Sequence, residues 1–71
     1  MSDDMKRRLE YFSFALETYK SAFRLTGREA YSIFKKTKAD EYIFDLYELL
    51  HVHGAEYLLT ELQEYMQTQP I

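Results

Sequence analysis

The sequence predicts an all-α fold, a compact bundle of four helices in a single domain over residues 1–71. Two glycines and one proline leave little from which to build hairpins. Apolar residues recur at steps of three and four, which is typical of amphipathic helices. The chain has no cysteine, so neither a disulfide nor a Cys-based zinc site can stabilise a fold this small. Apolar packing or self-association must therefore stabilise the fold.

The first helix is predicted from about Asp3 to Leu25. Its apolar residues have the seam spacing of a helix that packs along its whole length. They are Met5, Leu9, Phe12, Leu16, Tyr19 and Phe23. This seam is either the spine on which the other helices fold or, in part, a contact with the first helix of a second copy. The sequence leaves open whether the protein forms a homo-oligomer.

The second helix is predicted to begin after Thr26. Thr26 and Glu29 have the spacing of a capping box, in which each side chain binds a backbone N–H of the other residue. Its apolar positions cover little more than two turns before the run from Lys35 to Lys38, where cations suit the negative end of the helix dipole. This helix is therefore short.

The third helix is predicted to have Asp40 as its N-cap and to run to about His51 or Val52. Gly54 separates it from the last helix.

The last helix is predicted over about Ala55 to Gln67, with Pro70 beyond its end. The residues predicted to form the core of the bundle are Leu9, Phe12, Leu16, Phe23, Phe34, Ile43, Leu46, Leu50, Leu58 and Leu62.

The charges are sorted along the chain. The net charge is -1 over residues 1–19, +5 over residues 20–38 and -7 over residues 39–71, which gives -3 in total. Such complementary patches could meet each other, a symmetry mate or a partner.

The basic segment supports one functional hypothesis, a small nucleic-acid-binding regulator. Arg24, Arg28, Lys35 and Lys36 lie at the junction of the first two helices, where they could contact phosphates. A recognition helix presents polar side chains to base edges from its first turns, and here Arg28 is the only good candidate. We therefore favour a solvated face that pairs with the acidic half.

The sequence lacks the motifs that usually indicate an enzyme. The sequence has no cysteine, no Gly-rich phosphate loop and no recognisable Ser-His-Asp grouping, so we expect no enzyme and no cofactor. His51 and His53 lie on nearly opposite sides of a helix and cannot share a metal ion, while Glu48 and His51 alone would make a weak site. We expect His51 to satisfy carbonyls near Gly54 at the helix end, with His53 in the turn, and the role of this histidine pair is otherwise left open.

Aromatic content supports the hypothesis that we favour, a protein-binding module. Tyrosine and phenylalanine make up 17% of the chain, more than a small core can hide. Side chains at the margin of the apolar stripes should be partly exposed, either as a rim around the core or as interface anchors. They are Tyr11, Phe14, Phe44, Tyr57 and Tyr65. The predicted partner-binding residues are Tyr11, Tyr57 and Tyr65 with the flanking acids Glu61 and Glu64.

The residues also carry a family resemblance. It covers about Leu9 to Met66 and includes Phe14 to Tyr19, Ala30 to Lys36, Tyr42-Ile43 and, most specifically, Tyr-x-x-Leu-His-x-x-Gly-x-x-Tyr from Tyr47 to Tyr57. The chain resembles a family of short bacterial proteins catalogued as domain of unknown function 3791. Such proteins are often encoded beside a larger protein that resembles ADP-ribosyltransferases. The resemblance therefore implies an antitoxin-like or accessory protein whose partner is that enzyme.

The sequence also bears on location. No apolar run approaches the roughly 18 residues of a membrane-spanning helix. The N-terminus, Met1-Ser2-Asp3-Asp4, is acidic where a signal peptide is basic. We expect a cytoplasmic protein without membrane contact.

Overall fold

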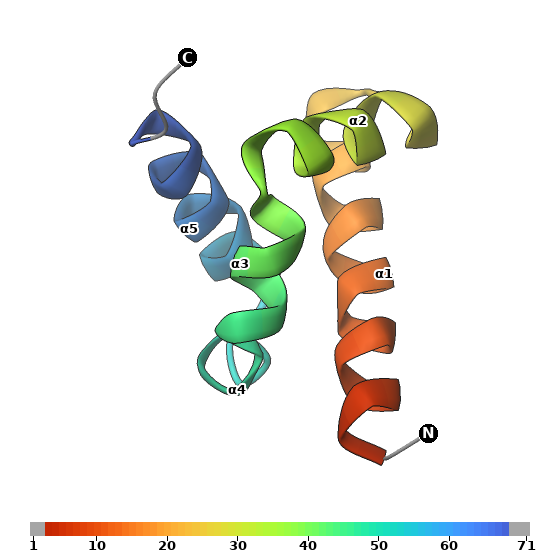
Figure 1. Cartoon of the computed structure of the whole chain (residues 1–71). Coiled ribbons are helices and arrows are strands. Elements are labelled where there is room, and N and C mark those ends of the chain that lie inside the picture. The colour runs from red at the N-terminus through yellow and green to blue at the C-terminus, as the bar shows by residue number, and fades with distance from the viewer. Residues whose placement is uncertain (1–2, 69–71) are drawn as a thin grey trace.

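The computed structural model of the protein describes residues 3–68, which form an all-α bundle without strands. The helices are α1 (Asp3–Phe23), α2 (Gly27–Thr37), α3 (Ala39–Asp45), α4 (Tyr47–Leu50) and α5 (Ala55–Gln67). α1 runs the length of the molecule, α2 crosses its C-terminal end, and α3 returns beside α1 to the short α4 (Figure 1). α5 then packs against α1 and α3. The predicted fold class is confirmed. None of the helices in this part of the chain is long and apolar enough to span a membrane.

α1 ends two residues before the predicted Leu25, because Arg24 turns the backbone. Arg24 adopts the left-handed conformation with φ 55°. The Leu25 N–H donates to the Lys20 carbonyl at 2.9 Å, and the Arg24 N–H donates to the Ser21 carbonyl at 3.4 Å. This pair of bonds is the Schellman motif, which closes the carbonyl end of a helix and favours glycine at the left-handed position.

The predicted capping box at the start of α2 is confirmed. The Glu29 N–H donates to Thr26 Oγ1 at 3.1 Å, and the Thr26 N–H donates to Glu29 Oε1 at 2.8 Å. α2 ends at Thr37, and the following Lys38 is left-handed with φ 62°. The chain thus reverses sharply between α2 and α3.

The prediction of one continuous third helix was wrong. Leu46 adopts φ -103° and ψ 18°, which divides the segment into α3 and α4, so the bundle has five helices rather than four. Asp40 is also not the N-cap that the sequence predicted. α3 begins at Ala39 after the left-handed Lys38, and the Asp40 carboxylate instead pairs with Lys35 Nζ at 3.0 Å.

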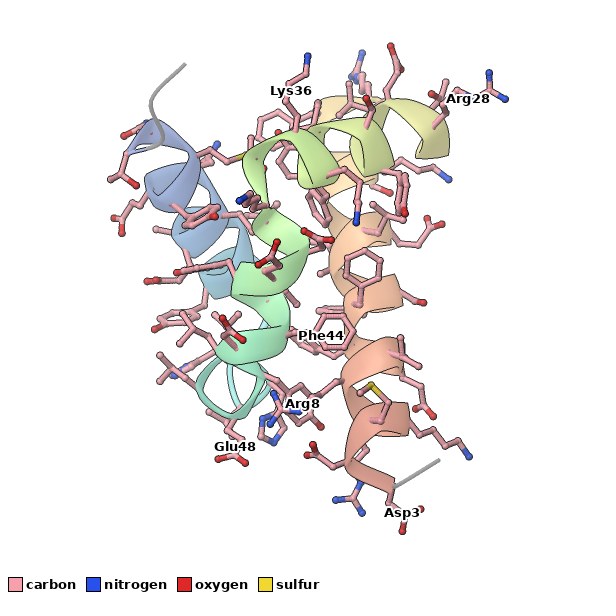
Figure 2. The ribbon with its side chains drawn as sticks, viewed as in Figure 1. Asp3, Arg8, Arg28, Lys36, Phe44 and Glu48 are labelled. Atoms are coloured by element: carbon pink, nitrogen blue, oxygen red, sulfur yellow. The ribbon has the colours of Figure 1, made fainter. Side chains whose placement is uncertain are left out.

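Arg8 of α1 braces this break. Its guanidinium donates to the carbonyl of Phe44, beside the break. It also lies over the Tyr47 ring at 5.2 Å, and its Nε donates to Asp4 Oδ2 in an ion pair at 2.8 Å. Figure 2 shows Arg8 and Glu48 close together at the lower end of the molecule, where their charged atoms lie 3.9 Å apart. Arg8 therefore connects α1 to both halves of the divided helix.

The core is small and lies where all the longer helices meet. Ala15, Ala30 and Ala39 are fully buried, so backbones approach closely at these positions. Phe34 of α2 packs against Phe12 and Tyr19 of α1, with ring centroids 6.0 and 5.3 Å away. The larger fully buried side chains are Phe34, Ile43, Leu50, Leu58 and Leu62, all of which the sequence predicted as core.

The prediction that two residues of α1, Leu9 and Phe23, belong to the core was wrong. Leu9 and Phe23 are each 42% exposed, whereas Phe12, Leu16 and Leu46 pack partly buried against the core. The reason is the orientation of α1, which turns Ala15 and Tyr19 into the bundle. One side of the predicted seam therefore faces outward.

The last helix has the predicted bounds, Ala55–Gln67, and Gly54 precedes it in an extended conformation. Pro70 lies outside the described residues.

Two adjacent leucines of α4 test the assignment of the core. Leu50 is fully buried and Leu49 is 49% exposed. We expect Leu50→Ala to lower the free energy of unfolding by about 2–5 kcal/mol, through lost burial and the cavity left behind. Leu49→Ala should lower it by under about 1 kcal/mol. Urea denaturation followed by circular dichroism measures both, and equal losses would contradict the core described above.

The backbone conformation of Arg24 allows a stabilising change. An L-residue with a side chain in the left-handed conformation costs roughly 1 kcal/mol, which glycine avoids. Arg24→Gly should therefore raise the free energy of unfolding by about 1 kcal/mol and the melting temperature by roughly 4–8 °C. Arg28→Gly, in the first turn of α2, is the control and should be destabilising. A lower melting temperature for Arg24→Gly would refute the account of this turn.

Candidate protein interface

Four of the five predicted partner-binding residues lie on α5, at one side of the seam between α3 and α5. They are Tyr57, Glu61, Glu64 and Tyr65, whose spacing places them on one side of the helix. Tyr42 of α3 joins them, and the five residues are called the tyrosine-glutamate surface below. Each tyrosine in it is half-buried, so it offers both a packed ring and an accessible edge.

Tyr42 connects the two helices of this surface. Its ring stacks on that of Tyr65, with centroids 4.2 Å apart and an interplanar angle of 26°. Its hydroxyl donates to Glu61 Oε2 at 3.2 Å. The carboxylate of Glu61 is therefore held in place by a neighbour from the facing helix, which reduces the entropy lost when a partner binds.

Tyr65 also holds the C-terminal end of α2. Its hydroxyl donates to the carbonyl of Thr37 at 2.9 Å and lies 3.2 Å from the carbonyl of Lys38. These carbonyls belong to the helix end that the left-handed Lys38 closes. Tyr65 therefore has a structural role in addition to its predicted place at an interface.

Tyr57 and Glu64 complete the surface. The Tyr57 ring stacks on His53 with centroids 4.0 Å apart. Glu64 is exposed. This arrangement offers hydroxyl groups, flat aromatic area and two carboxylates, which together suit cationic side chains of another protein.

Burial and charge favour the protonated hydroxyl at two tyrosines of this surface, Tyr42 and Tyr65. The pKa of Tyr42 is raised, first by desolvation and then by the charge of Glu61 and the hydrogen bond to it. Desolvation also raises the pKa of Tyr65, with the charges of Glu41 and Asp40 adding to the effect. The neutral hydroxyl is thus favoured at both positions.

Tyr11 lies elsewhere. It packs edge-on against Tyr47 of α4 with centroids 5.6 Å apart, and its ring is also 5.6 Å from Phe14. Its hydroxyl is buried and has no hydrogen-bond partner within residues 3–68. The structure therefore separates Tyr11 from the other four predicted residues.

Sequence reasoning did not single out Tyr42. Its partners Glu61 and Tyr65 are 19 and 23 positions away, so no local spacing reveals their contact. Only the high aromatic content and the Tyr42-Ile43 pair within the family resemblance gave a signal.

The predicted nucleic-acid contacts lie at the opposite end of the molecule from α4. Arg28 and Lys36 project away from the bundle on α2 (Figure 2), and Arg24 lies in the preceding turn. Lys35 differs from these three residues, because its hydrogen bond to Asp40 and then the charge of that carboxylate raise its pKa. This contact joins the basic and acidic segments, but Arg24, Arg28 and Lys36 make no ion pair with any residue that the structure describes. The charge separation seen in the sequence thus persists in the fold.

The histidines have local partners. His51 Nδ1 lies 2.9 Å from the Tyr47 carbonyl, at the start of α4 and not near Gly54 as the sequence predicted, and its ring stacks on Tyr47 at 4.5 Å. His53 stacks on Tyr57. Between residues 3 and 68, no three His, Asp or Glu side chains gather closely enough to hold a metal ion.

Comparison with known proteins supports the family resemblance. The family model described as "Protein of unknown function (DUF3791)" matches residues 10–69. The chain belongs to this family. Neither the curated proteins nor the solved structures contain a match.

The raised tyrosine pKa values make the stability of the fold depend on pH in the alkaline range. A tyrosine ionises near pH 10 in the unfolded chain and at higher pH in the fold, so its contribution to stability is full below about pH 10 and is lost above it. We expect the urea midpoint to fall between about pH 9.5 and pH 11, and to fall less steeply in Tyr42→Phe. Tyr31→Phe, at an exposed position, is the control. Identical slopes for wild type and Tyr42→Phe would count against a raised pKa at Tyr42.

Proposed function

We propose that this DUF3791 protein is a non-enzymatic module that binds another protein through the tyrosine-glutamate surface. The observation that carries this proposal is the arrangement of Tyr42, Glu61 and Tyr65, in which the stacked rings and the hydrogen-bonded carboxylate form one pre-organised acidic surface. Tyrosine is an effective interface anchor because it buries much area with few rotatable bonds.

Charge specifies the chemistry of the partner. Residues 39–71 carry seven acidic residues and no lysine or arginine, so this half of the molecule attracts a basic surface. A basic nucleotide-binding cleft fits this description. The family resemblance suggests which protein holds it, an ADP-ribosyltransferase-like enzyme encoded nearby, which this module would neutralise or assist in the cytoplasm.

A second function has one observation in its favour. Arg28 and Lys36 project from α2 without ion pairs among the described residues, as phosphate-contacting side chains of a nucleic-acid-binding regulator would. The same α2 carries few residues suited to base edges, so the protein-binding function takes precedence.

The test compares two matched double variants in a pull-down from the native host. Tyr57→Ala with Glu64→Lys changes the tyrosine-glutamate surface, whereas Phe14→Ala with Glu10→Lys makes the same chemical changes on α1. We expect the first variant to reduce capture of the partner by about tenfold or more and the second to leave it unchanged. Circular dichroism checks that both fold.

Nuclease treatment separates the two functions. A protein partner that survives nuclease, contains a basic cleft and is lost only with the first variant supports the proposal. Equal capture by both variants would refute the assigned surface. Loss of the captured material with nuclease, or with Arg28→Glu, would replace protein binding by nucleic-acid binding.

A further inference from the structure

The outward side of α2 is basic from one end of the helix to the other. Its exposed side chains include three cations at helical spacing, while Ala30 and Phe34 on the opposite side are fully buried. One more exposed cation precedes the helix and another follows it. The helix has 11 residues and is about 16 Å long. The whole set is called the α2 basic face below and consists of Arg24, Arg28, Lys35, Lys36 and Lys38.

Neighbouring carboxylates leave most of this positive charge uncompensated. Glu29 of α2 is bound to the Thr26 N–H at 2.8 Å in the capping box. Asp40 pairs with Lys35 Nζ at 3.0 Å, and Glu41 acts electrostatically on the same lysine. The other four members of the α2 basic face make no ion pair with any side chain in the described part of the chain. Their charges therefore remain free to contact a ligand.

Two of these cations occupy positions that favour glycine. Arg24 has φ 55° and Lys38 has φ 62°, left-handed conformations in which a side chain costs free energy. The helix dipoles do not require a cation at either position, because Lys20 lies in the last turn of α1 and Lys35 and Lys36 lie in the last turn of α2. The chain thus keeps a cation beyond each end of α2 against the preference of the backbone, which is typical of residues retained for function.

An exposed aromatic ring lies within the same face. Tyr31 is 49% exposed and makes no ring contact with another aromatic side chain of residues 3–68. Arg28, three residues before it, and Lys35, four residues after it, are its neighbours on the helix surface. The Tyr31 hydroxyl also acts electrostatically on Lys35. A flat ring is therefore flanked by cations on both sides.

This combination discriminates between ligands that carry phosphate. A membrane-surface helix inserts its apolar side among lipids, but the apolar side of α2, with Ala30 and Phe34, is inside the core. Duplex DNA is read by polar side chains in the first turns of a helix, and only Arg28 is suited to this. Single-stranded nucleic acid needs cations along its phosphates and an aromatic ring on which a base stacks. The length of α2 corresponds to about five nucleotides at 3.4 Å each.

We propose that the α2 basic face binds single-stranded nucleic acid, with phosphates on its cations and a base stacked on Tyr31. Arg28 and Lys36 project away from the bundle (Figure 2), where a strand can reach both. Arg24 and Lys38 extend the phosphate contacts beyond the two ends of α2. The inference rests on the second function proposed above, whose ligand it specifies, and it is independent of the tyrosine-glutamate surface.

The first experiment measures binding of the purified protein to a fluorescent oligothymidylate of about 20 nucleotides by anisotropy. Arg28→Glu and Arg7→Glu make the same change of charge at two exposed arginines, one on the α2 basic face and one on α1. We expect the dissociation constant to rise by about tenfold or more in Arg28→Glu and by less than about twofold in Arg7→Glu. Absence of binding at low salt, or equal effects of the two variants, would overturn the proposal.

The salt dependence of binding tests the left-handed cations. The logarithm of the affinity should fall with the logarithm of the salt concentration with a slope between about -2 and -3, or roughly -0.7 for each phosphate contact. Arg24→Gly should lower the affinity and reduce this slope by about 0.7, although the same variant is expected to melt at a higher temperature. Arg24→Lys, which keeps the charge, should preserve the slope. An unchanged affinity and slope in Arg24→Gly would contradict a phosphate contact at this position.

A ligand without bases tests the stacking on Tyr31. We expect Tyr31→Leu to weaken binding of the oligothymidylate by about tenfold and Tyr31→Phe to leave it unchanged, because stacking needs only the ring. Neither variant should change binding of inorganic polyphosphate, which presents phosphates alone. Equal losses for both ligands in Tyr31→Leu would refute the stacked base.

Two further measurements separate this proposal from its alternatives. Vesicles that contain phosphatidylserine should bind more weakly than the oligothymidylate, and binding to vesicles alone would replace the strand by a membrane surface. Tyr57→Ala with Glu64→Lys should not weaken binding of the oligothymidylate, and Arg28→Glu should not reduce capture of a protein partner after nuclease treatment. The two sites can therefore fail separately.

Discussion

Phe34 of α2, packed between Phe12 and Tyr19 of α1, is the contact on which the rest of the structure depends. α2 crosses the end of α1 after a turn of three residues, and this ring, with the fully buried Ala15 and Ala30, holds the two helices together. Each aromatic pair contributes about 0.5–1.5 kcal/mol beyond the area that it buries. The position of α2 in turn determines where α3 begins, through the left-handed Lys38. The path of the second half of the chain therefore depends on this aromatic cluster.

Tyr19 extends the same cluster to the last helix. Its hydroxyl lies 3.6 Å from the sulfur of Met66, and its ring contacts Phe23 and Phe34. Tyr65, next to Met66, holds the carbonyl end of α2 from the other side. Neighbouring residues at the C-terminal end of α5 thus contact α1 and the end of α2. The proposed binding surface is consequently joined to the core through Tyr65, which both packs in the fold and belongs to that surface.

The three faces of the molecule have different chemistry, and the division follows from the charge order along the chain. Six of the nine cationic residues lie in residues 20–38 and seven of the twelve acidic residues in residues 39–71, while α1 exposes Met5, Leu9, Phe14 and Phe23. Ion pairs between the segments are few, so most charges remain available to other molecules. Exposed ion pairs add little to stability, which leaves the apolar core as the main stabilising contribution.

The sequence by itself determined the helical class, the capping box at Thr26 and Glu29, the bounds of α5 and the five large buried side chains. These features follow from local hydrogen bonds and from a period of about 3.6 residues, which neighbouring residues encode. Only the tertiary structure decided which side of α1 is buried, because a wide apolar arc is compatible with several rotations of the helix.

Tertiary contacts also decided the break at Leu46 and the contact of Tyr42 with Glu61. Arg8 reaches a carbonyl of Phe44 from another helix, 36 positions away, and no local pattern reports such a contact. The same limit explains why four predicted surface residues came together while Tyr11 did not, since Tyr11 lies on α1 and the others share α5. Spacing within one helix is encoded locally, but the side of a helix that meets another depends on packing of the whole chain.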